Sequence, residues 1–257
     1  MCLPLLIDLD GVLRIGKLPA PGIREFLDFI RSSGVNACIL SNCSLSTGEH
    51  VRGFFKENSI TCNIPIITAA DAAFEFVSSK YSRVLAVVSD SVKHLFDGLI
   101  DEINPEAIVI GKKWDYNIML DIFNRLRGGA DLIALHKNKF WISPENELLL
   151  DAGPFITALE YATGKQAKLI GKPSPHYFQS ALHKLGFDSS QKFLMLGDDL
   201  ETDIYGAQSV GSIAVLIYTG KTKHPIPSES TVKPDYIAAD LRETIYLLEK
   251  MILDKVK

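Results

Sequence analysis

Two carboxylates stand at the end of a short apolar run near the start of the chain. The run Leu5-Leu6-Ile7 is followed by Asp8, and Asp10 comes two residues later, directly before Gly11. A short apolar run of this kind is typical of a buried strand. Two carboxylates crowded at its carboxyl end are costly unless a cation or hydrogen-bond donors compensate them. In open α/β sheets that edge is where ligands bind, so the feature predicts a phosphate or metal site.

The size and composition predict a globular protein with a substantial core. The chain has 257 residues, of which 47% are hydrophobic and 23% charged, and its formal net charge is −4. No basic block and no apolar run of membrane-helix length occurs, so we expect neither nucleic acid nor a membrane as a partner. The four cysteines show no C-x-x-C spacing, which favours reduced thiols and a cytoplasmic protein.

Short apolar runs alternate with helical patterns along the chain, which predicts βαβ units and a parallel sheet. Between residues 70 and 150 this rhythm continues without another acidic strand end, over a length that suits a small domain. We therefore expect an α/β protein with a discontinuous core, residues 1–69 and 151–257, and an inserted domain, residues 70–150. A strand at 168–170 is expected to return the chain to the core.

Polar residues follow four of the predicted strands. The first of these strands is the one before Asp8. The second ends at Ser41 and is followed by Asn42, the third ends at residue 170 before Gly171-Lys172-Pro173, and the fourth ends at residue 196 before Gly197-Asp198-Asp199. Asp203 lies four residues after Asp199. In one parallel sheet all four ends would meet at the same edge. Acidic clusters bind Mg²⁺ through oxygen ligands, while a hydroxyl and a lysine suit phosphoryl oxygens.

This ordered set resembles the haloacid dehalogenase superfamily in its phosphatase branch. The inserted segment matches that family's C2-type cap in position and size, and the stretches 149–163, 171–175 and 206–208 are similar to the NagD-like group, subfamily IIA. The resemblance implies a Rossmann-like parallel-sheet core with an inserted α/β cap. It also implies a Mg²⁺-dependent phosphatase acting on a small phosphorylated metabolite, a phosphomonoester or a pyrophosphate-like compound. A homodimer is common among such relatives and is expected here.

The resemblance further implies catalytic and metal-binding roles for the acidic strand ends. Asp8 would be the nucleophile that forms an aspartyl-phosphate, and Asp10 would act as general acid and then general base. Mg²⁺ would be held by the Asp8 carboxylate, the Asp10 main-chain carbonyl and Asp198.

Other residues would bind the phosphoryl group or support the site. Ser41, Asn42 and Lys172 would hold the oxygens over which the transition state spreads its charge. Asp203 would orient Lys172 or a metal-bound water, and Asp199 would have a supporting role.

His136 and Lys137 follow the predicted strand 132–135 of the inserted domain. In NagD-like relatives the loop at this position reads the substrate, and a histidine and a lysine there suit a negatively charged one. The alternative is a solvated hairpin turn.

Two other function classes also fit a phosphate site. A receiver-like phospho-acceptor switch uses aspartates, Mg²⁺ and a lysine, but the length of the chain, the inserted domain and a nucleophile on the first strand disfavour it. A catalytically silent phosphate-binding protein is the other alternative, although no motif residue is missing. Phosphate release over many turnovers separates both from an enzyme.

Overall fold

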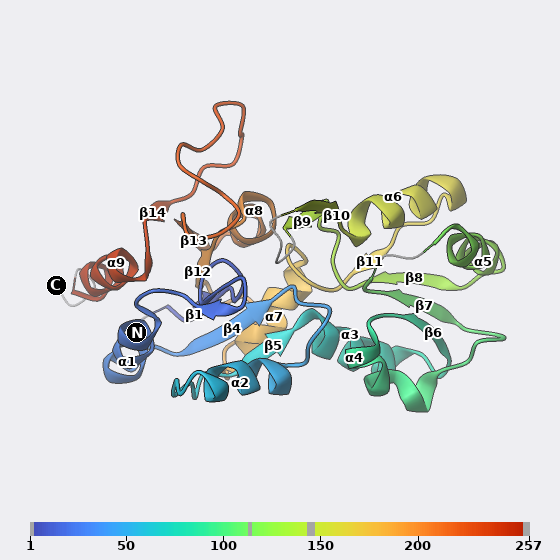
Figure 1. Ribbon diagram of the computed structural model, residues 1–257, viewed down its shortest axis with the longest axis horizontal. Coiled ribbons are helices and arrows are strands. Elements are labelled where there is room, and N and C mark those ends of the chain that lie inside the picture. Colours follow the sequence, from blue (N-terminus) through green and yellow to red (C-terminus); the bar gives the residue numbers. More distant parts are fainter. Residues whose placement is uncertain (1–2, 113–114, 143–146, 254–257) are drawn as a thin grey trace. The chain divides into compact units, whose positions relative to one another are not determined.

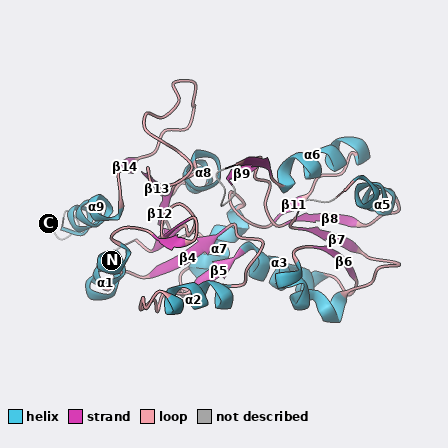
Figure 2. Ribbon diagram, in the orientation of Figure 1, coloured by secondary structure: helices cyan, strands magenta, loops and turns pink. Residues whose placement is uncertain are grey.

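The structure is a computed structural model that describes residues 3–112, 115–142 and 147–253. The chain forms two compact units, the first made of Met1–Ser41, His50–Ile67 and Lys172–Lys257 and the second of Asn42–Glu49 and Thr68–Gly171. Strands and helices alternate within each unit, which confirms the expected α/β class (Figures 1 and 2). Over the described residues, no helix has the length and apolar character needed to cross a membrane.

A six-stranded sheet forms the centre of the first unit. Its strand order is β14-β13-β12-β1-β4-β5, and the pairings from β14 through β4 are parallel. Strands β1, β4 and β12 are buried along their whole length, which explains their continuous apolar sequences. The strands are β1 (Leu5–Ile7), β4 (Ala37–Ser41), β5 (Ile66–Thr68), β12 (Leu194–Gly197), β13 (Ile213–Ile217) and β14 (Tyr236–Ala238).

Amphipathic helices complete this unit. Helix α1 (Ile23–Ser33) buries Ile23, Phe26, Leu27 and Ile30, spaced along one face, in the core and ends at Gly34 in the left-handed conformation. The other helices are α2 (Gly48–Glu57), α7 (Pro175–Lys184), α8 (Tyr205–Ser209) and α9 (Leu241–Leu253), with a π-helical turn at Leu200–Ile204.

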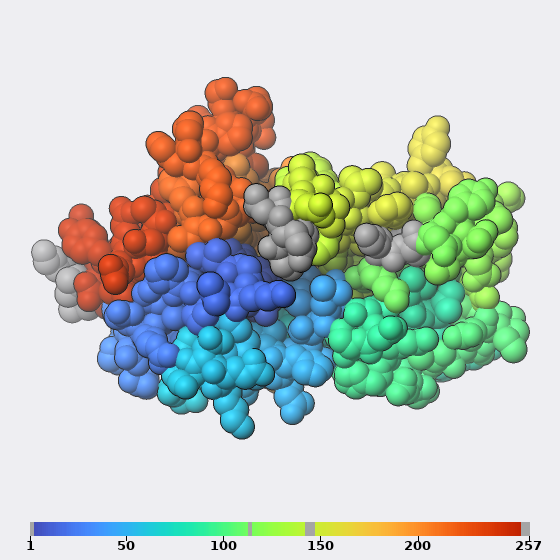
Figure 3. All heavy atoms as spheres, in the orientation of Figure 1, coloured from blue at the N-terminus to red at the C-terminus, as the bar shows by residue number. Residues whose placement is uncertain are grey.

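Two further features of the first unit matter for the site. A short antiparallel ribbon, β2 (Arg14–Ile15) with β3 (Leu18–Pro19), follows Asp10. The long segment between β13 and β14, residues 218–235, stands out from the surface of this unit (Figure 3).

The second unit has its own parallel sheet and core. The sheet order is β11-β8-β7-β6, and a separate antiparallel hairpin pairs β9 with β10. The strands are β6 (Val84–Val87), β7 (Ala107–Ile110), β8 (Asp131–Ala134), β9 (Phe140–Ile142), β10 (Leu148–Leu150) and β11 (Lys168–Leu169). The helices are α3 (Ala69–Lys80), α4 (Asp90–Lys93), a 3₁₀ helix (His94–Leu99), α5 (Tyr116–Arg127) and α6 (Ala152–Thr163).

The second unit extends to residue 171, whereas the sequence predicted that the inserted domain ends at residue 150. Helix α6 buries Ala152, Ile156 and Leu159 in the core of the second unit. Strand β11 pairs with β8 rather than with a strand of the six-stranded sheet. The expectation that all four polar strand ends share one sheet is therefore wrong, because β11 is a two-residue strand whose partner is fixed by tertiary packing.

Candidate active site

Three strand ends of the first unit carry the expected polar residues to one edge of the sheet. The neighbouring strands β12, β1 and β4 run parallel, and they end next to Asp198, next to Asp8 and at Ser41. Asp8 and Asp198 are almost fully buried, with 6% and 5% of their surface exposed. The register therefore places these side chains together through strand alignment, as expected for carboxyl ends of parallel strands.

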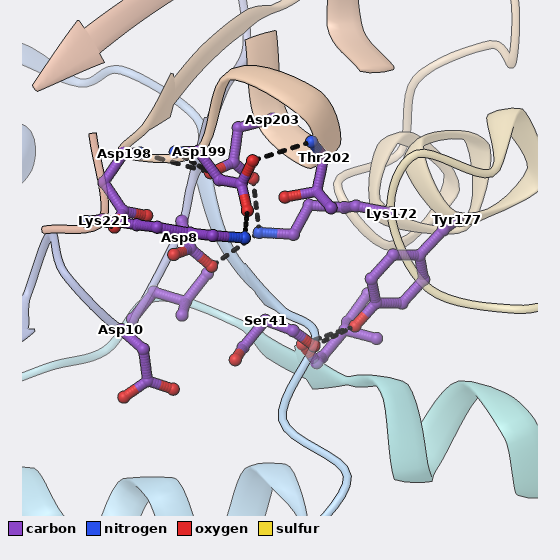
Figure 4. A network of polar contacts seen from close by, with 12 residues as sticks. Asp8, Asp10, Ser41, Lys172, Tyr177, Asp198, Asp199, Thr202, Asp203 and Lys221 are labelled. Carbon is purple, nitrogen blue, oxygen red and sulfur yellow. Dashed lines mark hydrogen bonds and ion pairs between the residues drawn. The ribbon is translucent and has the colours of Figure 1, made fainter. Parts of the chain in front are cut away.

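Lys172 brings a buried cation to this edge. Its ammonium Nζ lies 2.5 Å from Asp8 Oδ1 and 2.7 Å from Asp203 Oδ1, and only 2% of its side chain is exposed (Figure 4). Lys172 is the first residue of the first unit after the chain leaves the second. It thus reaches the edge from a connecting segment and not from the end of a strand in the same sheet.

Asp203 supports this arrangement from the π-helical turn. Its Oδ2 accepts hydrogen bonds from the main-chain N–H groups of Asp198 and Asp199, each at 3.2 Å. Its other oxygen faces the Lys172 ammonium. One carboxylate therefore fixes both the backbone that carries Asp198 and the cation that contacts Asp8, which is the contact expected of a residue that orients Lys172.

Burial has the largest effect on the pKa values of Asp8, Asp198 and Asp203, which with Lys172 form one buried cluster. Burial raises the pKa of Asp8 to about 7, although the Lys172 ammonium opposes the rise. Burial also raises the pKa of Asp198 and of Asp203, and the charge of Asp8 adds to the effect on Asp198. Burial lowers the pKa of Lys172, but the carboxylates of Asp203 and Asp8 raise it more, so its net direction is upward and the ammonium stays charged.

The donor set of the cluster suits a hard divalent cation. One carboxylate oxygen from each of Asp8, Asp198 and Asp203 lies within 4.8 Å of the others. Carboxylate oxygens are the ligands that Mg²⁺ prefers, and a dication would offset the charge that a single ammonium leaves uncompensated. Since both oxygens of Asp203 already face donors, the first two carboxylates are the natural ligands.

The loop after β13 also belongs to this edge, which the sequence analysis missed. The main-chain N–H of Lys221 donates to Asp198 Oδ2, and the Lys221 ammonium lies 2.6 Å from Asp199 Oδ2. Gly220 lies so close that a Cβ there would overlap the Asp198 carboxylate. The signal in the sequence was Thr219-Gly220-Lys221, which begins two residues after a buried strand, because glycine permits this close approach of the backbone.

Asp199 is held in place rather than presented to a ligand. Its Oδ1 caps the turn by accepting from the N–H groups of Glu201 and Thr202, and its Oδ2 pairs with Lys221. Burial raises the pKa of Asp199, but Lys221 and these hydrogen bonds lower it more, so the net direction is downward. The supporting role expected for Asp199 thus corresponds to a link between the loops after β12 and β13.

Ser41 is the buried last residue of β4, with 1% of its surface exposed. The Tyr177 hydroxyl donates to the main-chain carbonyl of Ser41 at 2.6 Å and to that of Ile67 at 3.2 Å. Tyr177 lies on α7, which begins three residues after Lys172. This hydrogen bond therefore ties the helix that follows Lys172 to the strand end that carries Ser41 (Figure 4).

The Asp10 carboxylate lies outside the cluster. It is directed away from the Asp8 carboxylate (Figure 4) and forms a two-point pair with Arg14, with distances of 2.7 and 3.0 Å. Half of the Asp10 side chain is exposed. The sequence placed Asp10 at the site through its spacing from Asp8, but spacing does not determine where a side chain points.

The remaining predicted residues, Asn42, His136 and Lys137, lie in the second unit. The Lys137 ammonium pairs with the buried Glu160 carboxylate at 2.6 Å. His136 is 3% exposed, and its Nε2 lies 3.2 Å from Ser44 Oγ. Both side chains thus have partners within their own unit rather than the solvent contacts expected of a simple hairpin turn.

Family comparisons agree with the geometry of the first unit. The family model described as haloacid dehalogenase-like hydrolase matches residues 5–99, and the HAD-hydrolase-like model matches residues 169–244. The human haloacid dehalogenase-like hydrolase domain-containing protein 2 is 32% identical over 239 residues, which cover 91% of each chain. The human phospholysine phosphohistidine inorganic pyrophosphate phosphatase is 32% identical over 253 residues, which cover 95% of this chain and 93% of the relative.

Solved structures show the same fold. A glycerol phosphate phosphatase from Mycobacterium tuberculosis in complex with magnesium has a TM-score of 0.78 and 25% identity, covering 93% of this chain and 75% of that one. NagD from Escherichia coli K-12 has a TM-score of 0.81 and 23% identity, covering 93% and 96%.

Proposed function

The chain belongs to the haloacid dehalogenase-like hydrolase family as a NagD-like phosphatase, and we propose that it hydrolyses a small phosphorylated metabolite through an aspartyl-phosphate on Asp8. The observation that carries this proposal is the buried cluster in which Asp8, Lys172 and Asp198 meet at one edge of a parallel sheet. A similar protein is named an inorganic pyrophosphate phosphatase, and another a glycerol phosphate phosphatase. The proposed substrate class therefore includes phosphomonoesters and pyrophosphate-like compounds.

Mg²⁺ is the proposed cofactor. The Asp8 and Asp198 carboxylates would hold it together with the main-chain carbonyl of Asp10. When bound, it would neutralise charge between the Asp8 carboxylate and the anionic phosphoryl group. The raised pKa of Asp8, about 7, supports this assignment, because added positive charge nearby would favour its ionised form, and burial shifts the pKa of Asp198 in the same direction.

The reaction would proceed in two steps, transfer of the phosphoryl group to Asp8 and hydrolysis of the resulting aspartyl-phosphate. In the first step, an Asp8 oxygen attacks phosphorus, and the bond to the leaving oxygen breaks as Asp10 gives that oxygen a proton. In the second step, Asp10 takes a proton from water as the water oxygen attacks phosphorus. The bond to Asp8 then breaks, inorganic phosphate leaves, and both side chains return to their starting state.

The other residues of the site would position and stabilise the phosphoryl group. Lys172 would contact phosphoryl oxygens while Asp203 keeps its ammonium in place, and Ser41 would contribute its hydroxyl. Asn42 would add its amide to this set. We retain His136 and Lys137 as proposed substrate-reading residues, although their present partners, Ser44 and Glu160, would have to share them.

A cytoplasmic location and a homodimer complete the proposal. Of the three described cysteines, the buried Cys38 and Cys62 are free thiols, which supports a reducing compartment. The fourth, Cys2, lies outside the described residues. The net charge of −4 supports a small phosphorylated substrate as the partner rather than nucleic acid. Sedimentation of the purified chain tests the dimer.

The decisive experiment replaces the nucleophile. Asp8→Asn should abolish Mg²⁺-dependent hydrolysis of p-nitrophenyl phosphate while the far-ultraviolet circular dichroism spectrum stays that of the wild type. The matched control is Asp28→Asn, on the exposed Asp28–Arg31 pair of α1, which should keep full activity. Retained hydrolysis in Asp8→Asn would refute the proposed role. Release of no more than one equivalent of phosphate by the wild type would instead favour the switch.

A further inference from the structure

The pair between Asp10 and Arg14 is the starting point. The Arg14 guanidinium donates from Nε to Asp10 Oδ1 at 2.7 Å and from a terminal nitrogen to Oδ2 at 3.0 Å. Such fork-to-fork pairing is the geometrically most specific contact between arginine and a carboxylate. Both oxygens of Asp10 thereby accept from Arg14, and the carboxylate is directed away from the Asp8 carboxylate (Figure 4).

The backbone and a neighbouring ring hold Arg14 in this position. The main-chain N–H of Arg14 donates to the Leu9 carbonyl at 2.8 Å, and its own carbonyl accepts from Gly11 at 2.7 Å. The guanidinium carbon lies 5.5 Å from the centre of the Phe54 ring, within the range of a cation–π contact. Arg14 is therefore fixed at both ends, by a tight turn and by α2, while the partner carboxylate is half exposed.

We propose that Arg14 is a positioning residue that holds the Asp10 carboxylate away from Asp8 in the substrate-free protein. This inference rests on the proposed function, in which Asp10 serves as general acid and base. For either proton transfer the carboxyl must come within hydrogen-bond reach of the leaving oxygen or of the attacking water. The two-point pair must therefore open in each catalytic cycle, and the free energy of the pair adds to the barrier of the steps that use Asp10.

The leaving group of the substrate reveals this effect. A p-nitrophenolate leaves readily without a proton, whereas the phenolate of phenyl phosphate, a much stronger base, benefits from an acid. Weakening the Arg14–Asp10 pair should therefore raise the kcat/KM for phenyl phosphate more than the kcat/KM for p-nitrophenyl phosphate. The relevant quantity is the ratio of the kcat/KM values for the two substrates, because loss of structure lowers both values and leaves their ratio unchanged.

The test compares Arg14→Met, which keeps an apolar stem over Phe54, with Arg125→Met. Arg125 pairs with Asp121 at the same distance, 2.7 Å, and with the same i,i+4 spacing as Arg14 with Asp10. The exposed fractions of the side chains also match: 22% and 20% for the two arginines, and 51% and 50% for the two aspartates. We expect Arg14→Met to raise the phenyl to p-nitrophenyl ratio about twofold to fivefold, as the free energy of an exposed ion pair allows. Arg125→Met should leave the ratio unchanged. Added salt should raise the wild-type ratio but not that of Arg14→Met, because salt screens the pair.

Several results would overturn the inference. These are a lower ratio in Arg14→Met, an equal rise in Arg125→Met, or a rise that persists when Asp10→Asn is combined with Arg14→Met. An unchanged ratio in a fully active Arg14→Met would refute the positioning role while the proposed function stands. If the wild-type chain hydrolyses neither ester, the proposed function fails, and the inference fails with it.

Discussion

Lys172→Met should destabilise the protein more than any other single loss of a lysine in the described structure, because it removes the cation from a cluster of buried carboxylates. The Lys172 side chain is 2% exposed and contacts Asp8 and Asp203, which are themselves buried. Removing one partner of a buried ion pair costs about 3 to 5 kcal/mol, since the remaining charge is left without compensation. We expect a loss of this size in the free energy of unfolding at pH 8 without Mg²⁺.

The loss should depend on pH, and its sign follows from the raised pKa of Asp8. A carboxyl whose pKa is higher in the folded than in the unfolded state stabilises the fold at low pH, and this stability is lost as the pH rises through the folded value. That value is about 7 for Asp8 with Lys172 present, and it should be higher without Lys172. The deficit of the variant should therefore be smaller at pH 5.5 than at pH 8, by about 1 kcal/mol or more.

Urea denaturation followed by circular dichroism at the two pH values measures both quantities. Lys137→Met is the control, because Lys137 also pairs with a buried carboxylate, that of Glu160, but keeps 31% of its side chain exposed. Water screens that pair, so its loss should be smaller. Equal deficits for the two variants, or a Lys172→Met deficit that does not change with pH, would refute the reasoning.

Further predictions concern the metal, the close glycine and the thiols. Mg²⁺ at a hundred times its Kd should raise the free energy of unfolding by about 2.7 kcal/mol, and no shift in the urea midpoint would argue against a metal site. Gly220→Ala should weaken Mg²⁺ binding in a calorimetric titration, because a Cβ there overlaps the Asp198 carboxylate, whereas Gly53→Ala, which meets no atom within 4 Å, should not. Burial raises the pKa of Cys38 to about 12, so mass spectrometry after brief alkylation at pH 8 should find native Cys38 unmodified and the more exposed Cys43 labelled.

The sequence predicted the strand ends well because the physics at those positions is local. Asp8, Ser41 and Asp198 follow short apolar runs that become buried parallel strands, and the register of such strands aligns their carboxyl ends. The apolar runs themselves were recognisable, since strands buried on both faces have no polar alternation. The gathering of these polar residues at one edge of the sheet could therefore be predicted without coordinates.

The prediction failed where tertiary packing decides. Strand β11 has two residues, and nothing in them distinguishes pairing with β8 from pairing with the larger sheet. Helix α6 could cover either sheet, and only its contacts with α5 and the second core place it in the second unit. The direction of a side chain could not be predicted either, as Asp10 shows. The two-point contact of Asp10 with Arg14 depends on a turn, and the spacing between Asp8 and Asp10 does not determine that turn.

The residues that fix the buried cluster of Asp8, Lys172, Asp198 and Asp203 belong to one unit, although the chain changes unit between them. The chain leaves the first unit after Ser41, rejoins it for His50–Ile67, and returns to it finally at Lys172. Yet the contacts that fix the cluster, from Lys172 to Asp8 and Asp203 and from Lys221 to Asp198, all lie within the first unit. The positions of the proposed nucleophile and metal ligands therefore depend on the sheet of the first unit and on its loops.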